Sequence, residues 1–508
     1  MQLLRAATTV GAYTALSRIL GLIREILMSH VLGAGLISDA FVVAFKFPNF
    51  FRRFFAEGAF NAAFVPQFAG RLAQQGLVPA KILADHVFSV MAWFLLVFVA
   101  GVEIFAADLM PYLAPGFITT PERLSLATEF TRITFPYILF ISLSSLLAGV
   151  LNSIDRFAAA AAAPILLNIM MIAALLVFPT LRMEPGFVLS VSVFIAGVVQ
   201  FLWLYWVCGR TNINLRLGLP VLTDDVKKVL KLMIPGAIGA GVMQINLLVD
   251  MILASLLPTG SLSYLYYADR LNQLPLSIFG VAIGTALLPP LSRYWRKGDV
   301  EKALQTQITA LEIALQLTVP AAIGLIVLSH LLIKLIFGHG HFTATDVAAT
   351  APTLAAFALG LPAYVVGKVF STTYFAREDT TTPVKAAVIC VVSNFIMNLI
   401  FMKWFLHIGM ALATSLSAWI NVIILGALLK RDGFFVFSRQ LLIMTLKVVV
   451  LSAVMGLLLV FLQDTFPNNA TSIFGEILIT LGYVFIGILS YCLGGYAIGI
   501  RPWVSLRA

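Results

Sequence analysis

The sequence reads YTALSRILGLIREILMSHVLG at residues 13–33 and DAFVVAFKFPNFFRRFFAEGAFNAAFVP at residues 39–66. Both stretches are apolar enough to cross a membrane. Within them lie Arg18, Arg24 and Arg52, with Asp39 between them. A charged side chain at the bilayer centre costs about 2.5–3.5 kcal/mol on insertion scales. We therefore expect the arginines to line a wet cavity between helices, and a cationic cavity indicates an anionic cargo.

The composition of the whole chain is that of a membrane protein. Of the 508 residues, 60% are hydrophobic and 11% are charged, whereas a soluble domain has roughly 45–50% apolar and about 25% charged residues. The mean hydropathy is +0.99. These values predict an all-α polytopic membrane protein.

Apolar segments long enough for one crossing, about 20 residues each, predict fourteen transmembrane helices. Their expected limits are 8–31, 36–62, 82–107, 127–151, 160–180, 187–208, 231–257, 263–290, 303–336, 348–375, 384–404, 408–429, 441–463 and 472–498. Pro48 and Pro275 are expected to interrupt the second and the eighth helix. Such breaks persist where protein or a cavity satisfies the freed backbone groups.

The charges of the predicted loops indicate the orientation. Loops on the side of the two termini carry most of the lysines and arginines, for example in 210–231 and 293–302, whereas the opposite loops offer Arg123, Arg182 and Lys403. Because cytoplasmic loops are rich in Lys and Arg, we expect both termini in the cytoplasm. This bias partly accounts for the net charge of +10 and requires no nucleic-acid partner. The loops are too short for a soluble catalytic domain.

Two weak internal repeats indicate a duplicated architecture. LAGVLNSIDRFAAAAAAPILLNIMM from Leu147 is similar to FSTTYFAREDTTTPVKAAVICVVSNFIMN from Phe370. FPNFFRRFFAEGAFNAAFVP, ending at Pro66, is similar to LNQLPLSIFGVAIGTALLPP, ending at Pro290. Transporters are often built from such repeats. The repeats predict two six-helix bundles and two further helices, with domains at 1–215, 216–435 and 436–508.

Several motifs together resemble one known family. SRILGLIREI, GAGLISDAFVVAFKFPNFFRRFFAEGAFNAAFVP, APGF at Ala114, TFPYILFISLSSLLAGVLNS and YYADRLNQLP are similar to the MurJ (MviN) family of lipid II flippases, part of the multidrug/oligosaccharidyl-lipid/polysaccharide exporter superfamily. The resemblance covers essentially the whole chain. It implies two six-helix lobes in a V and a groove for the polyprenyl tail formed by the two C-terminal helices.

The resemblance also implies an activity and a location. A family member moves lipid II, the undecaprenyl-diphosphate-linked peptidoglycan precursor, from the inner to the outer leaflet of the bacterial cytoplasmic (inner) membrane by alternating access. Such a protein is a transporter and not an enzyme. Its expected partners are lipid II, membrane lipids and cell-wall synthesis proteins.

The charged residues fit a diphosphate cargo. Guanidinium groups bind phosphate oxygens in a bidentate fork. By resemblance, four arginines match positions that the family requires: Arg18, Arg24, Arg52 and Arg270. Asp39 matches another required position, and a carboxylate would repel a diphosphate, so we interpret Asp39 and Glu57 as gating or counter-ion residues. Asn49 and Ser263 are candidate cavity residues.

Each of these residues also has a structural interpretation. Intramembrane arginines are usually paired with carboxylates. The acidic residues close in sequence are Glu25, Asp39, Glu57 and, beside Arg270, Asp269. Arg52 could instead extend to the membrane interface. Asn49 and Ser263 could simply form hydrogen bonds between packed helices.

A second group of residues is a candidate sodium site. Asp250 lies in an otherwise uncharged segment, Asn394 and Asn398 share one helix face, and Thr414 lies on the next predicted span. The resemblance adds the backbone carbonyl of Met410, but this chain has Asn398 where the family pattern has an acid. Amide hydrogen bonds between helices are the alternative. Coupling to Na⁺, to H⁺ or to the membrane potential is expected, with no other cofactor.

Two other functions are open on sequence alone. A drug or organic-cation antiporter of the same superfamily would need an anionic cavity, and the predicted cavity is cationic. A polytopic enzyme acting on polyprenyl phosphates would need clustered carboxylates, a metal motif or a base in a loop at the membrane face. The sequence presents none of these patterns.

Overall fold

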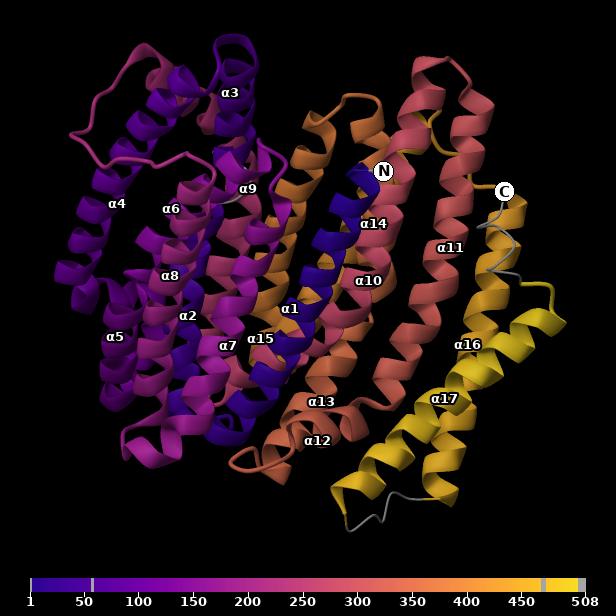
Figure 1. The fold of residues 1–508 in the computed structure, drawn as a ribbon. Helices are drawn as coiled ribbons and strands as arrows, with labels where there is room; N and C mark the ends of the chain where they lie inside the picture. The colour runs from indigo at the N-terminus through magenta and orange to yellow at the C-terminus, as the bar shows by residue number, and fades with distance from the viewer. Residues whose placement is uncertain (1, 56–58, 467–471, 501–508) are drawn as a thin grey trace. The chain divides into compact units, whose positions relative to one another are not determined.

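The computed structural model describes residues 2–55, 59–466 and 472–500. The regular structure of these residues is helical throughout (Figure 1). The chain forms two compact units, Met1–Gly260 and Ser261–Ala508. Among the described residues, nine helices or helix pairs are long and apolar enough to cross a membrane. The protein is therefore a multi-pass, all-helical membrane protein.

The first unit contains nine α-helices and one short 3₁₀ helix in its described part. They are α1 (Gln2–Leu32), α2 (Leu36–Phe55), α3 (Ala59–Gln75), α4 (Leu77–Leu113), η1 (Pro115–Thr119), α5 (Pro121–Thr134), α6 (Tyr137–Asn152), α7 (Phe157–Leu181), α8 (Pro185–Arg210) and α9 (Asp224–Ser255). Helix α7 packs against α1 and α8, α2 packs against α5, and α3 packs against α9. The repeats assign α9 to the second lobe. The predicted lobe boundary after residue 215 stays a prediction, because packing in one conformation does not define which helices move together.

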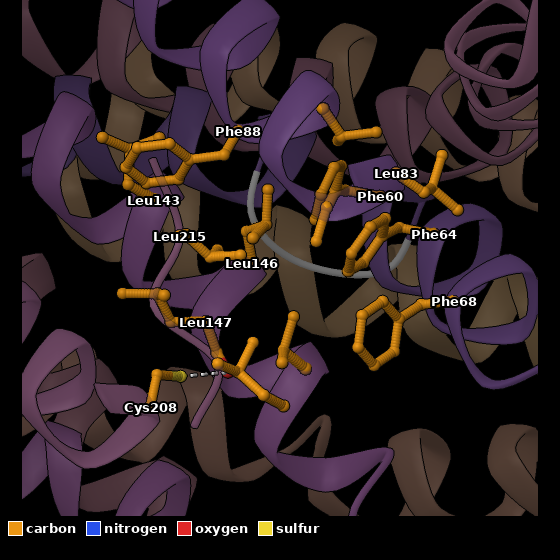
Figure 2. Close-up of a cluster of buried hydrophobic side chains, with 14 of the residues drawn as sticks. Phe60, Phe64, Phe68, Leu83, Phe88, Leu143, Leu146, Leu147, Cys208 and Leu215 are labelled. Atoms are coloured by element: carbon orange, nitrogen blue, oxygen red, sulfur yellow. Dashed lines mark hydrogen bonds between the residues drawn. The ribbon is translucent and has the colours of Figure 1, made fainter. Parts of the chain in front are cut away.

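Phenylalanines spaced four residues apart build much of the core of the first unit. Phe60, Phe64 and Phe68 follow one face of α3, with ring centroids 5.3 Å and 5.7 Å apart. They belong to a buried cluster that also includes Phe88 of α4 and Leu147 of α6 (Figure 2). Residues at i and i+4 lie above one another on a helix, so this spacing places the three rings in one continuous apolar row along α3.

The prediction that Pro48 and Pro275 interrupt their helices is wrong. Helix α2 continues through Pro48, and α10 continues through Pro275. A proline inside a helix leaves the carbonyl four residues earlier without its usual N–H partner. For Pro48 that carbonyl belongs to Ala44, and it accepts a hydrogen bond of 2.8 Å from the Thr134 hydroxyl of α5. The neighbouring helix thus satisfies the backbone, and α2 stays regular.

The second unit contains eight α-helices in its described part. They are α10 (Ser261–Arg296), α11 (Val300–Val327), α12 (Ser329–Phe337), α13 (Ala344–Ala358), α14 (Leu361–Ala376), α15 (Thr381–Arg431), α16 (Arg439–Thr465) and α17 (Ile473–Ala497). Helix α10 packs against α11, α13 and α14. Helices α16 and α17 pack against each other, and α16 also packs against α11.

Helix α15 is two helices joined by a very tight turn. Leu406 has a non-helical backbone, with φ 50° and ψ −129°. In a continuous helix, residues eight apart are separated by about 12 Å along the axis. The Phe401 carbonyl oxygen instead lies 2.3 Å from where a Cβ on Gly409 would be. The chain therefore folds back here, and a side chain at position 409 would collide with backbone.

The N-terminus of α15 is held by a carboxylate. Asp379 Oδ1 accepts hydrogen bonds from the backbone N–H groups of Thr381 (2.9 Å) and Thr382 (3.0 Å), and Oδ2 accepts one from the Thr382 hydroxyl (2.7 Å). The bonds from Thr382, first from its backbone and then from its side chain, lower the pKa of Asp379 below its ordinary value. Carboxylates that satisfy the free N–H groups of a first turn stabilise the helix.

We expect Asp379→Asn to lower the free energy of unfolding by about 0.5 kcal/mol at neutral pH, because it removes the negative charge at the helix N-terminus. Because the pKa of Asp379 is lowered in the folded chain, its stabilisation is fully present above the unfolded value of about 3.9 and is lost as the pH falls through the folded value. Thermal unfolding in detergent should show a difference from wild type at neutral pH that disappears in acid. Glu378→Gln controls for net charge. A difference that is the same in acid would contradict this account.

Candidate functional site

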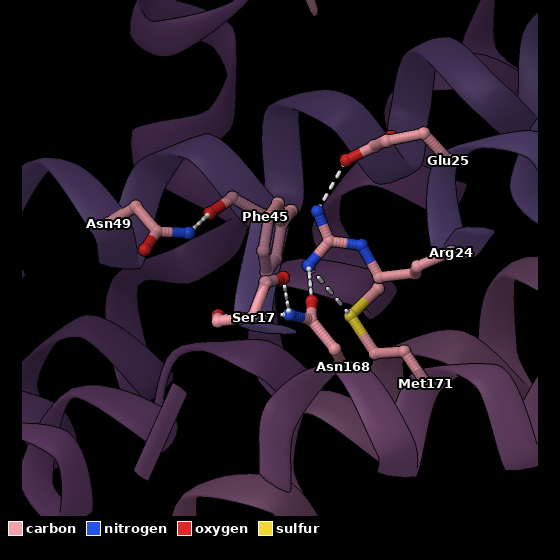
Figure 3. Close-up of polar contacts among 7 residues, drawn as sticks. All are labelled: Ser17, Arg24, Glu25, Phe45, Asn49, Asn168 and Met171. Atoms are coloured by element: carbon pink, nitrogen blue, oxygen red, sulfur yellow. Dashed lines mark hydrogen bonds and ion pairs between the residues drawn. The ribbon is translucent and has the colours of Figure 1, made fainter. Parts of the chain in front are cut away.

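Arg24 is buried where α1, α2 and α7 meet (Figure 3). Only 9% of its surface is exposed. One terminal nitrogen, Nη2, forms an ion pair with the Glu25 carboxylate. The other, Nη1, donates to Asn168 Oδ1 at 2.9 Å and lies 3.8 Å from Met171 Sδ. The Phe45 ring of α2 lies 5.9 Å from the guanidinium carbon.

Asn168 connects α7 to α1 through both ends of its amide. Its Oδ1 accepts from Arg24, and its Nδ2 donates to the Ser17 carbonyl at 2.9 Å. The side chain is 5% exposed. Sequence reasoning missed this residue, although an amide in an otherwise apolar span is a signal for helix–helix hydrogen bonding. Asn168 fixes the direction of the Arg24 guanidinium relative to α1.

The charge of Arg24 is compensated in this conformation. Glu25 is 3% exposed, and buried charges persist in proteins only when they are paired and hydrogen-bonded. From the sequence, Arg24 could be paired or free to bind cargo; in the structure the neighbouring Glu25 carboxylate is its partner. An anion that approached Arg24 in this conformation would compete with Glu25 for the guanidinium.

Arg18 and Arg24 have different surroundings on the same helix. Six residues along a helix turn the side-chain direction by about 240°, so the two arginines lie on different faces of α1. Arg18 is exposed, whereas Arg24 is buried. One helix thus presents one cation to its surroundings and holds the other inside the unit.

Arg52 is positioned by Asn49 on the same helix, α2. Arg52 Nε donates to Asn49 Oδ1 at 3.1 Å, and Asn49 Nδ2 donates to the Phe45 carbonyl at 2.7 Å. Both side chains are half-buried. The structure thus joins Asn49 to a predicted cargo-binding arginine through a hydrogen bond.

Asp39 forms a buried ion pair with Arg123 of α5. The two side chains are 0% and 2% exposed, and Arg123 Nη2 lies 2.5 Å from Asp39 Oδ2. The same oxygen accepts a hydrogen bond of 2.7 Å from the backbone N–H of Gly260, which follows α9. The Arg123 guanidinium stacks on Phe117, 3.8 Å from the ring centroid. Asp39 thereby connects α2 to α5 and to the end of the first unit. Glu57, the other predicted gating residue, lies outside the described residues.

The predicted cargo residues of the second unit lie on α10. Arg270 is half-buried, with its guanidinium carbon 4.6 Å from the centroid of the Tyr266 ring. The neighbouring Asp269 accepts a hydrogen bond from the Gln273 amide. Ser263, at the start of the helix, is fully buried.

The residues predicted to bind sodium form short-range hydrogen bonds. In the second unit, Asn398 Nδ2 donates to Asn394 Oδ1 at 3.0 Å, and the Thr414 hydroxyl donates to the Met410 carbonyl at 2.9 Å. Asp250 belongs to the first unit and accepts a bond of 3.2 Å from Asn246. Carbonyl, carboxylate and hydroxyl oxygens are chemically suitable for a hard cation. Among the described residues, no cluster of three or more His, Cys, Asp or Glu side chains forms a metal site.

Known proteins are similar to this chain along nearly its whole length. The family model "Lipid II flippase MurJ" matches residues 28–480. A "Probable lipid II flippase MurJ" of Rhizobium tropici is 38% identical, covering 98% of this chain and 96% of the relative. A "Lipid II flippase MurJ" of Burkholderia cenocepacia is 36% identical, covering 86% of this chain and 85% of the relative.

Solved structures agree with these relatives. The structure of "Lipid II flippase MurJ, inward closed conformation" has a TM-score of 0.80 at 29% identity, covering 97% of this chain and 99% of its own. An inward-facing multidrug resistance MATE family transporter has a TM-score of 0.67 at 16% identity, a likeness of fold alone. A family model and relatives above 30% identity cover most of the sequence, and we conclude that this chain belongs to the lipid II flippase MurJ family.

Proposed function

We propose that this protein is a lipid II flippase, which moves the undecaprenyl-diphosphate-linked peptidoglycan precursor from the inner to the outer leaflet of the bacterial inner membrane. The observation that carries the proposal is the similarity to lipid II flippases over nearly the full length of the chain. A transporter of this kind performs no chemical step on its cargo. Its work is to shield a charged head group from hydrocarbon.

The proposed binding site for the diphosphate consists of arginines. Its members are Arg18, Arg24, Arg52 and Arg270, with Asn49 and Ser263 as polar neighbours. A diphosphate offers more charge and more acceptor oxygens than one carboxylate, and guanidinium–phosphate pairs are strong and bidentate. We propose that the cargo replaces Glu25 as the partner of Arg24, while Asn168 keeps the guanidinium in place. The ion pair seen here would then be the state without cargo.

We propose that the chain crosses the membrane fourteen times, with both termini in the cytoplasm. Three observations support this number: the nine apolar spans, the division of α15 into two helices, and the long helices α1, α2, α9 and α10. In this arrangement residues 1–215 and 216–435 are two lobes in a V that alternate access. Residues 436–508, with α16 and α17, provide the groove for the lipid tail.

Coupling to a cation or to the membrane potential belongs to the same proposal. Asp250, Asn394, Asn398, Thr414 and the Met410 carbonyl would hold Na⁺ through oxygen atoms. Coupling to H⁺ or to the potential acting on the arginines is the other candidate. Cell-wall synthesis proteins are proposed as partners. Lipid II binding is measured for the wild type and for Asp250→Asn, each with and without sodium. If sodium affects binding equally in both proteins, the result would argue against the ion site.

The test is depletion of this protein in its host, with an assay that reports lipid II in each leaflet. We expect lipid II exposed on the periplasmic face to fall while the precursor accumulates inside. A plasmid copy of the wild type, or of Lys403→Gln as a charge control, should restore exposure. Unchanged periplasmic exposure after depletion would refute the flippase function.

A further inference from the structure

The segment between α8 and α9 is an extended strap held along α4. We call residues 213–222 the strap. The backbone N–H of Arg216 donates to Asp85 Oδ1 at 2.8 Å, and the N–H of Gly218 donates to Ser89 Oγ at 2.9 Å. The Trp93 indole N–H donates to the Gly218 carbonyl at 3.0 Å. The strap therefore has a defined position on a membrane-spanning helix and is not a free linker (Figure 1).

The strap buries its first apolar residues and exposes the later ones. Ile213 and Leu215 are 1% exposed. Beyond them, Leu217 is 58% exposed and Leu219 is 79% exposed. Val221 and Leu222 are exposed as well. An apolar run that projects outward while its backbone is fixed indicates an apolar partner.

The position of the strap on α4 indicates a membrane interface near Trp93, further along the helix than residue 82, where the sequence predicted the span to begin. Helix α4 has 37 residues, about 55 Å, whereas the hydrocarbon core needs about 20 residues. Lys81 and Asp85 precede Trp93, and exposed apolar side chains such as Phe94 and Val97 follow it; the next charged residue of α4 is Glu103. Tryptophan is enriched at the level of the lipid head groups. Because Trp93 binds the strap directly, the strap lies where the polar part of α4 ends.

The end of α8 independently indicates the same depth in the membrane. Its exposed tryptophans, Trp203 and Trp206, precede Arg210. The Arg210 guanidinium stacks on Trp206, 3.8 Å from the ring centroid. Arg210 and Arg216 are both exposed beside the strap. Of the nearby acidic groups, Asp85 accepts the Arg216 backbone N–H, Asp225 forms an ion pair with Arg71 at 2.7 Å, and Asp224 forms one with Lys227 at 3.1 Å.

We propose that the strap is an anionic-phospholipid site: its leucines insert between the acyl chains at the head-group boundary, and Arg210 and Arg216 bind the lipid phosphates. Exposed leucines next to arginines are the chemistry that interfacial segments use on charged membranes. Exposed apolar side chains also follow Trp93 on α4, for example Phe94 and Val97, which favours lipid over a soluble partner. The site would hold the chain at one depth in the membrane immediately before α9.

Spin labels at Leu217→Cys and Leu219→Cys test the insertion. The background is Cys390→Ala and Cys492→Ser, since Cys208 is buried, and the protein is placed in nanodiscs of phosphatidylethanolamine and phosphatidylglycerol. We expect both labels to collide more with oxygen than with a water-soluble nickel chelate. A label at Gln75→Cys, exposed at the end of α3, should show the reverse. Labels on the strap that behave like Gln75→Cys would overturn the proposal.

Native mass spectrometry of the full chain tests the choice of lipid. Arg210→Gln with Arg216→Gln should lower retained phosphatidylglycerol by about fivefold for each arginine removed. Arg182→Gln with Lys403→Gln removes the same charge at exposed positions predicted to face the other side and should retain wild-type binding. An equal loss of retained phosphatidylglycerol in both double variants, or no loss in Arg210→Gln with Arg216→Gln, would overturn the role of the arginines.

Discussion

Arg24→Ala is expected to abolish lipid II binding and flipping and also to destabilise the first unit. The substitution removes the guanidinium that pairs with Glu25 and binds Asn168. Deleting one partner of a buried ion pair typically costs about 3–5 kcal/mol, because the other charge stays buried. We expect no rescue of depleted cells, no lipid II retained in native mass spectrometry and a lower free energy of unfolding.

The double variant Arg24→Ala with Glu25→Ala separates the two effects. With both charges removed, most of the stability should return, since replacing a whole buried pair is often close to neutral. Transport should stay lost because the cargo still lacks its guanidinium. Restored flipping by the double variant would show that Arg24 acts only as the partner of Glu25. Arg24→Lys keeps the charge without the bidentate fork and should bind lipid II weakly.

Asp39→Asn is the second substitution for which we expect a large effect. Asp39 and Arg123 are nearly inaccessible, and the same carboxylate accepts the Gly260 N–H. An asparagine keeps the shape but leaves Arg123 as an uncompensated buried cation. The free energy of unfolding should fall by about 3–5 kcal/mol, measured by denaturant unfolding in detergent micelles.

A double-mutant cycle identifies the pair as the cause. Asp39→Asn combined with Arg123→Gln should be more stable than Asp39→Asn alone, because the buried cation is gone. Glu122→Gln, at an exposed neighbour of Arg123, should behave as wild type. If Asp39→Asn and the double variant lose equal stability, the uncompensated Arg123 cation is not the cause of the loss.

The positions of the helices along the sequence were largely predictable, because hydropathy is a property of each local segment. Most predicted spans coincide with helices of the structure. The exceptions are of two kinds. Short breaks divide the predicted spans 127–151, 303–336 and 348–375 into α5 and α6, α11 and α12, and α13 and α14. In contrast, Thr134 of a neighbouring helix lets α2 continue through Pro48, and this effect cannot be read from the residues of α2 alone.

The positions of the intramembrane charges were predictable from the sequence, but their pairing was not. Arg24 and Asp39 are conspicuous because they are charged in apolar segments. Their partners are harder to identify: Asn168 lies 144 residues from Arg24, and Arg123 was interpreted as a loop cation although it is 84 residues from its partner Asp39. Pairing of this kind depends on which helix faces which, and a single sequence carries little information on that.

The turn at Leu406 has a consequence for how the chain is made. The two halves of α15 are joined without a loop, and Gly409 lies against the backbone of Phe401. In the proposed fourteen-span arrangement, the start of the second half reaches the far surface together with the end of the first half. Only Lys403 and His407 near the turn are costly to translocate. The two halves should therefore enter the membrane together as a hairpin, and a sequence inserted after Leu406 should impair biogenesis before it affects transport.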